Sequence, residues 1–197
     1  MISKAPQAVL VSNGNGFEDL LARASTRDRA AIEKHLAVCD AEPSPAHAKL
    51  WRRLAAKLCD LAPLPVRTIG EQAVLFFIAD GKYRMQVFAL EDNRDGQLVV
   101  YLPDVMALAV SEKLLRKSDN QYVLVSTKGQ KLPVEAMDNT KTPDPSQSVK
   151  HMLGWNRKAV KVTLSTSELD NSLVSALESL CALAARKWAA AETPVSR

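Results

Sequence analysis

The stretch AVLFFIA, from Ala73 to Ala79, constrains the fold most, because every position in it is apolar. A strand without a polar position has to be covered on both faces, so this stretch predicts an interior strand of a sheet. Asp80-Gly81 follows at once, and this dipeptide accepts the positive φ angles of a tight hairpin turn. The chain is therefore expected to form an antiparallel meander, which we place at residues 66–102.

The residues after this turn alternate between apolar and polar side chains. In KYRMQVFAL, residues 82–90, Lys82 and Arg84 occupy the polar positions, which predicts a strand with one basic face. EDNRDG, residues 91–96, is typical of a second turn, and QLVVYL, residues 97–102, of a third strand.

Pro103 introduces a predicted helix, DVMALAVSEKLLRK, over residues 104–117, with its cations at the carboxyl end where the helix dipole favours them. A hairpin follows, with strands YVLVS at 122–126 and KLPVEAM at 131–137 around the turn TKGQ. Pro133 indicates that the second of these strands lies at a sheet edge or is broken there, because proline cannot donate to a ladder.

The last third of the chain predicts a loop, a strand and a helix. The polar, proline-containing residues 138–148 indicate the loop, and AVKVTL, residues 159–164, alternates like a strand. Ser165 and Glu168 have the spacing of a capping box at the start of a long amphipathic helix. This helix is expected to close the core.

Two helical segments precede the strands. Residues 17–39 have helical spacing with an expected break at Ser25-Thr26, and a second helix is expected from Ser44-Pro45 to about Asp60. The cations of the second helix share the side away from its apolar stripe, which predicts a solvated face, with contact to phosphates as the alternative. These cations are Lys49, Arg52, Arg53 and Lys57.

The order of elements predicts an α+β fold: a mainly antiparallel sheet of hairpins, helices packed on one face, and a long C-terminal helix. We divide the chain into a flexible N-terminal tail at 1–16, a helical extension at 17–44, the α+β domain at 45–190 and a C-terminal tail at 191–197.

The charge is spread unevenly along the chain. Residues 1–109 carry 13 Lys and Arg against 13 Asp and Glu, whereas residues 110–197 carry 13 against 9, so the second part holds the whole net charge of +4. A mild basic excess of this kind is compatible with a polyanionic partner.

The cysteines and the hydropathy predict a cytoplasmic protein. Cys39, Cys59 and Cys181 are widely spaced and odd in number, which favours buried thiols in a reducing compartment over a disulfide framework. The chain contains no uninterrupted apolar run of about 18 residues that would span a bilayer. We therefore expect no contact with a membrane.

No catalytic, metal or cofactor site is predicted. His35 and Cys39 stand four residues apart on an expected helix, but a metal site needs three or four converging ligands. His151 has no nucleophile in a recognised turn and no paired acids beside it, so packing against the sheet or a phosphate contact is the preferred interpretation. We expect a protein without enzymatic activity.

The stretch KHMLGWNRKAVKVTL, residues 150–164, carries the densest basic character. Because Val160 and Val162 are expected to point inward, Lys161 faces outward and can neutralise a phosphate. Trp155 has two interpretations, a plug of the core or a ring that stacks on a base.

Several local matches give the chain a resemblance to the MmcQ/YjbR family. They are Gly70 before an apolar strand, GKYRMQVFAL, YLPDVMALAV, the pairs His151-Met152 and Trp155-Asn156, and the closing amphipathic helix. The resemblance covers roughly residues 45–190. It implies a fold of the double-wing type, for which DNA binding is the expected activity.

The basic segments and the resemblance together predict a nucleic-acid-binding module that contacts backbone phosphates through basic hairpin tips and the strand at 157–161. The alternative is a protein-interaction or small-ligand domain whose sheet uses a surface of Phe77, Phe88 and Tyr101. The candidate nucleic-acid contacts are Lys82, Arg84, Lys128, Lys131, Lys150, His151, Trp155, Asn156, Arg157, Lys158 and Lys161. The first interpretation requires that these cations form one continuous patch.

Overall fold

A computed structural model describes residues 16–41, 45–61, 66–69, 74–79, 85–93, 97–138, 158–165 and 170–192. Its helices are α1 (Gly16–Arg23), α2 (Thr26–Ala41), α3 (Pro45–Leu61), α4 (Met106–Ser111) and α6 (Asn171–Glu192). Its strands are β1 (Val66–Ile69), β2 (Val74–Ala79), β3 (Met85–Asn93), β4 (Gln97–Pro103), β5 (Leu115–Ser118), β6 (Gln121–Val125), β7 (Lys131–Asp138) and β8 (Lys158–Ser165).

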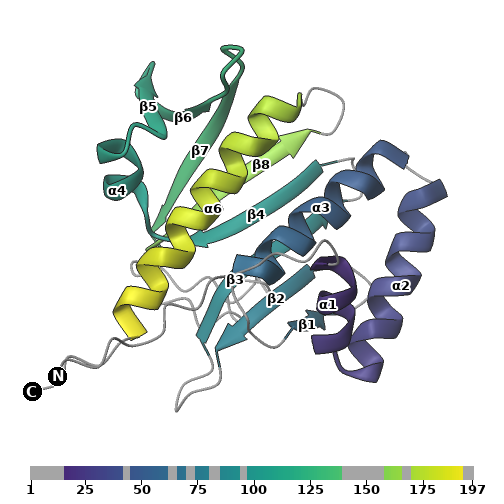
Figure 1. Ribbon diagram of the computed structural model, residues 1–197. Helices are drawn as coiled ribbons and strands as arrows, with labels where there is room; N and C mark the ends of the chain where they lie inside the picture. The colour runs from purple at the N-terminus through teal and green to yellow at the C-terminus, as the bar shows by residue number, and fades with distance from the viewer. Residues whose placement is uncertain are drawn as a thin grey trace, which may run out of the picture.

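The eight strands form one antiparallel sheet in the order β1-β2-β3-β4-β8-β7-β6-β5 (Figure 1). The sheet therefore consists of two four-stranded meanders, β1 to β4 and β5 to β8, joined through their last strands. The joining ladder runs from the pair Gln97↔Ser165 to the pair Pro103↔Ala159.

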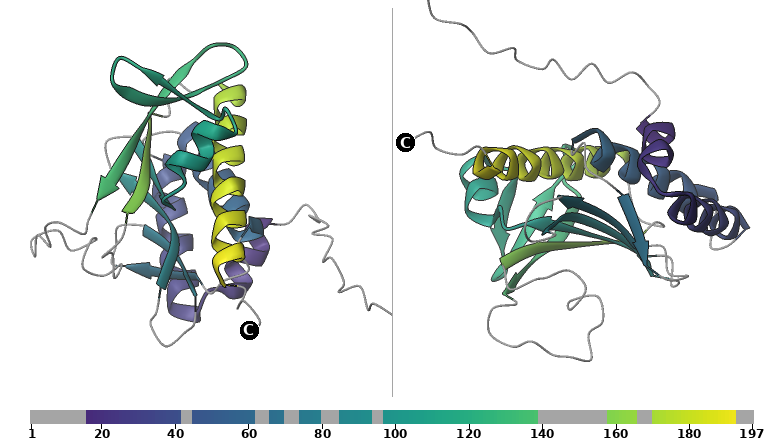
Figure 2. Two further views of the ribbon diagram at one scale, coloured as in Figure 1. Left: turned by 90° about the vertical axis from the view of Figure 1, so that its left-hand side faces the viewer. Right: turned by 90° about the horizontal axis from the view of Figure 1, so that it is seen from below.

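The helices lie on one face of this sheet. Figure 2 shows α3 and α6 along the same side of the strands, with α1 and α2 beyond α3. The sheet positions beneath them are apolar, and Val100, Val162 and Leu177 are all fully buried. This arrangement confirms the predicted α+β class, with helices on one face of an antiparallel sheet and a long C-terminal helix.

The N-terminal helices follow the predicted pattern. The expected break at Ser25-Thr26 is the gap between α1 and α2, and the second expected helix is α3, which begins at Pro45. Its apolar stripe is buried through Trp51, Leu54 and Leu58. Side chains of α1, α2 and α3 belong to the same hydrophobic cluster as those of the sheet.

The helix predicted over residues 104–117 is too long. Helix α4 ends at Ser111, and residues 115–118 form β5, which pairs with β6. Lys113 separates them with a φ of 61°, an angle at which no right-handed helix continues. The pattern misled because LLRK suits a helix as well as a short edge strand.

The first meander differs from its prediction in two details. Strand β3 extends to Asn93, so Glu91 and Asp92, expected in a turn, are strand residues paired with β4. A bulge opposite Phe77 and Ile78 adds one residue to β3, so the expected strict alternation does not continue across it. β2 lies between β1 and β3, as expected for an interior strand. The side chains of β2 and the Asp80-Gly81 turn lie outside the described residues.

Of the two alternatives predicted from Pro133, an edge strand is wrong for β7, which lies between β6 and β8. Pro133 pairs with Val123 of β6, but the ladder to β8 begins only at Val134. At Pro133, β7 therefore has a paired neighbour on one side only, and the missing N–H of proline is tolerated there.

The predicted capping box at Ser165 and Glu168 is also displaced. Ser165 is the last residue of β8, and α6 begins at Asn171 with Asp170 before it. The Asp170 Oδ1 atom accepts hydrogen bonds from the Leu173 amide at 2.8 Å and the Ser172 hydroxyl at 2.7 Å. This carboxylate is therefore the N-cap of α6.

Asp28 fastens α2 to the outer edge of the sheet at β1. Its Oδ1 atom accepts hydrogen bonds from both the amide and the hydroxyl of Thr68, each at 2.9 Å, and Oδ2 accepts one from the Ser25 hydroxyl. Ala24 also forms a parallel bridge with Val66. These contacts cover backbone groups that an edge strand would otherwise offer to another chain.

Replacing Asp28 by Ala is expected to lower the free energy of unfolding by about 2 kcal/mol, because the partly buried amide and hydroxyl of Thr68 are then without their acceptor. Urea denaturation measures the decrease. Glu33→Ala is the control, since Glu33 is an exposed carboxylate of the same helix and should cost less than about 0.5 kcal/mol. Equal decreases in the two variants would contradict the assigned role of Asp28.

Candidate nucleic-acid interface

Most of the predicted contact residues lie outside the part of the chain that the structure describes. Lys158 is in β8, but its side chain is not described. The three with described side chains are Lys128, Lys131 and Lys161. Those outside the described residues are Lys82, Arg84, Lys150, His151, Trp155, Asn156 and Arg157.

Lys161 lies in the middle of the sheet, on the face opposite the helices. It stands between Tyr101 of β4 and Glu135 of β7, and its ammonium group lies 3.3 Å from the Glu135 carboxylate. The Tyr101 hydroxyl donates to Glu91 at 2.8 Å, and burial together with this carboxylate raises the pKa of Tyr101. Among the described side chains of this face, Lys161 is therefore paired with a carboxylate and lies near a second one, Glu91.

The register separates the residues of the alternative apolar surface. Phe77 pairs with Phe88, and position 88 shares a strand face with Leu90, which is fully buried on the helix side. Tyr101 pairs with Ala89, which is on the other face. Positions 77 and 88 are thus not on the face of Tyr101.

Lys128 and Lys131 lie at the turn between β6 and β7. The Ser126 hydroxyl accepts the backbone amides of Lys128 and Gln130, and Gly129 supplies a φ of 83°. The Lys131 ammonium donates to the Ser118 hydroxyl at 3.3 Å, so this turn lies beside the end of β5.

Three further cations lie on the same part of the fold, and sequence reasoning missed them as a group. The pattern places Lys113, Arg116 and Lys117 at a helix end, but they precede or belong to β5 and are exposed. We call residues 113–131 the basic wing. It contains five Lys and Arg residues and one acidic residue, Asp119.

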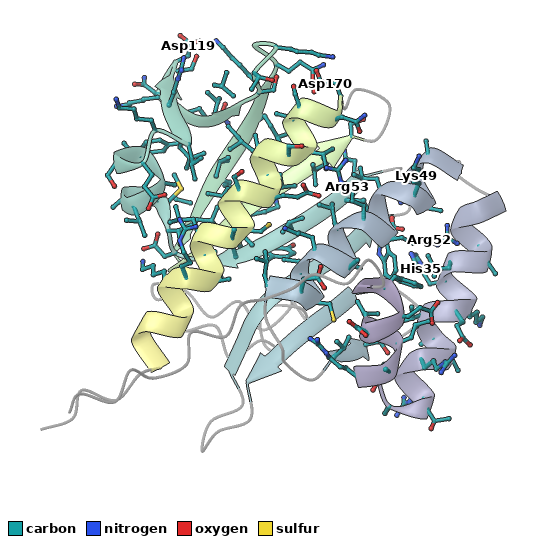
Figure 3. The ribbon with its side chains drawn as sticks, in the orientation of Figure 1. His35, Lys49, Arg52, Arg53, Asp119 and Asp170 are labelled. Carbon is teal, nitrogen blue, oxygen red and sulfur yellow. The ribbon has the colours of Figure 1, made fainter. Side chains whose placement is uncertain are left out.

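Within the wing, β5 and β6 form a hairpin with a two-residue turn. Asp119 and Asn120 have φ angles of 49° and 64°, and positive φ at both central positions is what a type I′ two-residue hairpin turn requires. Figure 3 shows Asp119 at the outer end of this hairpin, far from His35 of α2. The sequence SDNQ carries this turn signal, since Asp and Asn tolerate positive φ better than other side chains.

One cation of α3, Arg53, binds a carboxylate of another helix. The Arg53 guanidinium binds Glu178 of α6 through two hydrogen bonds, at 2.7 and 3.0 Å, and so links the two helices (Figure 3). Lys49 is exposed, whereas Arg52 and Lys57 are half-buried. The structure therefore gives Arg53 a role in helix packing, which neither interpretation of this face predicts.

A buried polar cluster joins α2, α3 and β3. One carboxylate oxygen of Asp92 lies 2.8 Å from Nε2 of His35 and 2.8 Å from Nε2 of His47. His47 is fully buried, and the His35 ring lies 5.5 Å from the Trp51 ring. No sequence pattern signals this cluster, because Asp92 is far along the chain from both histidines.

The two cysteines whose side chains are described, Cys59 and Cys181, are buried. Burial raises the pKa of Cys59 to about 11 and that of Cys181 to about 12, which disfavours the reactive thiolate. Among the described residues, no group of three or more His, Cys, Asp or Glu side chains is arranged to hold a metal ion. None of the helices in the described ranges has the length and hydropathy to cross a membrane.

Comparison with protein-family models, with curated proteins and with solved structures gives no match. The resemblance to the MmcQ/YjbR family therefore stays a prediction from the sequence.

The wing contacts α6 at the N-cap. Lys128 lies 4.0 Å from the Asp170 carboxylate, and the side chain of Gln130 accepts the Asp170 amide at 3.4 Å. Hydrogen bonds from Ser172 and from the Leu173 amide are the main causes that lower the pKa of Asp170. Because the pKa of Asp170 is lower in the folded state, the ionised carboxylate stabilises the fold at pH values above 3.8, the ordinary pKa of the group. This contribution is lost as the pH falls through the lowered pKa.

Asp170→Asn keeps a capping oxygen but removes the charge. We expect the melting temperature of the wild type to exceed that of this variant at pH 7, and the difference to vanish as the pH falls through the lowered pKa of Asp170. Thermal denaturation between pH 7 and pH 2.5 measures both. A difference that does not change with pH would show that the charge of Asp170 adds nothing to the cap.

Proposed function

We propose that this chain binds nucleic acid through the basic wing, with contacts to backbone phosphates. One observation carries the proposal: the wing places five exposed cations, Lys113, Arg116, Lys117, Lys128 and Lys131, at one end of the sheet with a single acidic residue among them. The excess within these residues equals the net charge of the whole chain, +4.

Electrostatics favours a polyanion as the partner of such a surface. Each phosphate that a Lys or Arg neutralises releases condensed counterions, so several closely spaced cations give an affinity that isolated ones do not. The neighbouring carboxylate Glu112 is already paired with Arg186 of α6 at 3.1 Å, which reduces its opposition to a bound anion.

The proposal differs from the expectation drawn from the sequence in the residues it uses. Lys128 and Lys131 keep their role, and the cations of β5 join them. The Lys161 side chain is 31% exposed and lies 3.3 Å from Glu135, which disfavours a phosphate contact, whereas the Lys128 side chain is 73% exposed and lies 4.0 Å from Asp170. The resemblance to the MmcQ/YjbR family, which implies DNA binding, points in the same direction.

Backbone contact is the expected mode of binding. Lysine ammonium groups are point charges that recognise phosphates without reading base edges; of the four lysines of the wing, Lys113 and Lys128 lie in turns and Lys131 begins β7. Binding is therefore expected to depend strongly on salt and weakly on sequence.

The test replaces Lys113, Lys128 and Lys131 together by Gln and measures binding to a fluorescent 20-base-pair DNA by anisotropy at two salt concentrations. We expect the slope of log K against log salt to fall in magnitude by about 0.9 for each phosphate that the variant no longer neutralises, and binding at low salt to weaken at least tenfold.

A second triple variant controls for net charge. Lys34, Lys49 and Lys57 are helical lysines outside the wing, and their replacement by Gln changes the net charge by the same amount. This variant should bind within about threefold of the wild type, since long-range charge is screened beyond about 10 Å. Equal weakening in both variants, or no binding by the wild type, would refute the proposal.

A further inference from the structure

We propose that the nucleic acid bound by the wing is a duplex, and that the β5–β6 hairpin enters its major groove with Arg116 and Lys117 facing the two strands. This inference rests on the proposed function and adds the class of ligand and the way in which the wing meets it.

The first support is the direction of the two cations. Arg116 and Lys117 are consecutive residues of β5, and successive side chains of a strand point to opposite faces. Both are exposed, although Leu115 before them is buried. The hairpin thus carries one cation on each of its faces.

The second support is the position of β5 in the sheet. It is the last strand in the order of the sheet, paired only with β6, and lies farthest from α1 and α2 (Figure 1). Leu115, Val123 and Leu124 are buried at the base of the hairpin, so a ligand can approach its outer edge and the part near the turn, where Arg116 and Lys117 are exposed. Two rows of phosphates on either side of a groove match this distribution, whereas one strand offers a single row.

The third support is the shape of the hairpin. β6 also pairs with β7 from Tyr122 to Val125, so the hairpin is a two-stranded ribbon only at its tip, around the Asp119-Asn120 turn, where the strands lie about 4.8 Å apart. The major groove of B-form DNA is about 12 Å wide and admits a two-stranded ribbon.

Single-stranded nucleic acid suits the wing less well. Proteins that hold single strands stack bases on exposed aromatic rings, and the wing contains one aromatic residue, Tyr122, which is half-buried on β6. The wing offers charge to phosphates but little surface to unstacked bases.

Asp119 has a particular place in this arrangement. It is the acidic residue of the wing, it is exposed, and it lies at the tip that would enter the groove first. Its carboxylate would meet the negative potential of the duplex, so it should limit the affinity. Asn in its place removes the charge and still accepts the positive φ of 49°.

The first experiment compares a 20-base-pair duplex with a single strand of the same length, using wild type, Arg116→Gln, Lys117→Gln and the double variant. The wild type should bind the duplex at least tenfold more tightly than the single strand. Each single substitution should reduce the magnitude of the salt slope for the duplex by about 0.9, and the double by about 1.8. Arg116→Lys keeps the charge and should keep the slope.

The second experiment measures a gain of affinity, which a misfolded variant does not give. Asp119→Asn should bind the duplex about threefold more tightly than the wild type at low salt, and the gain should shrink at high salt. Weaker binding by this variant would show that the carboxylate contacts the ligand favourably and would overturn the proposed insertion of the tip.

The outcomes separate this inference from the proposed function. If the wild type binds neither duplex nor single strand at low salt, the proposed function fails, and this inference fails with it. If it binds both equally, or if only one of Arg116 and Lys117 affects the slope, binding by the wing survives and insertion into a groove is wrong.

Discussion

The pairing of β4 with β8 is the constraint on which the rest of the structure depends. It connects strands about 60 residues apart along the chain and joins two meanders that would otherwise be separate sheets. Val100 and Val162 meet at its centre, fully buried beneath the helix layer. Because each strand there has a neighbour on both sides, the two ends of the sheet are left as its edges, and those edges differ in chemistry.

At one edge, the chain covers its own strand. Ala24 and Asp28 engage β1, and the cluster of Asp92 with two histidines ties α2 and α3 to β3. At the other edge, β5 carries Arg116 and Lys117 in exposed positions, which discourages pairing with another strand and supplies the charge that the proposed function requires. Helix α6 supports this second end through Asp170 near Lys128 and through Arg186 bound to Glu112.

The sequence is sufficient to predict the elements whose pattern is local and repeated, such as the apolar stripe of α3 and the hairpin around Gly129. It fails where one segment suits two structures: LLRK fits a helix end and an edge strand, and only its pairing with β6 decides between them. The Asp92 cluster and the Lys161–Glu135 pair depend on contacts distant along the chain, so no spacing reveals them. The site prediction therefore finds the turn at Lys128 but not the cations of β5 that lie beside it.

The central claim is that the basic wing, and not the centre of the sheet, meets the ligand. The most direct measurement is the change of backbone amide NMR shifts when a short DNA duplex is added to the labelled protein. The account predicts the largest changes at residues 113–131, with small changes around Lys161 and Glu135 on the helix-free face and along α3. Changes centred on Lys161 or on α3, with the wing unaffected, would contradict it.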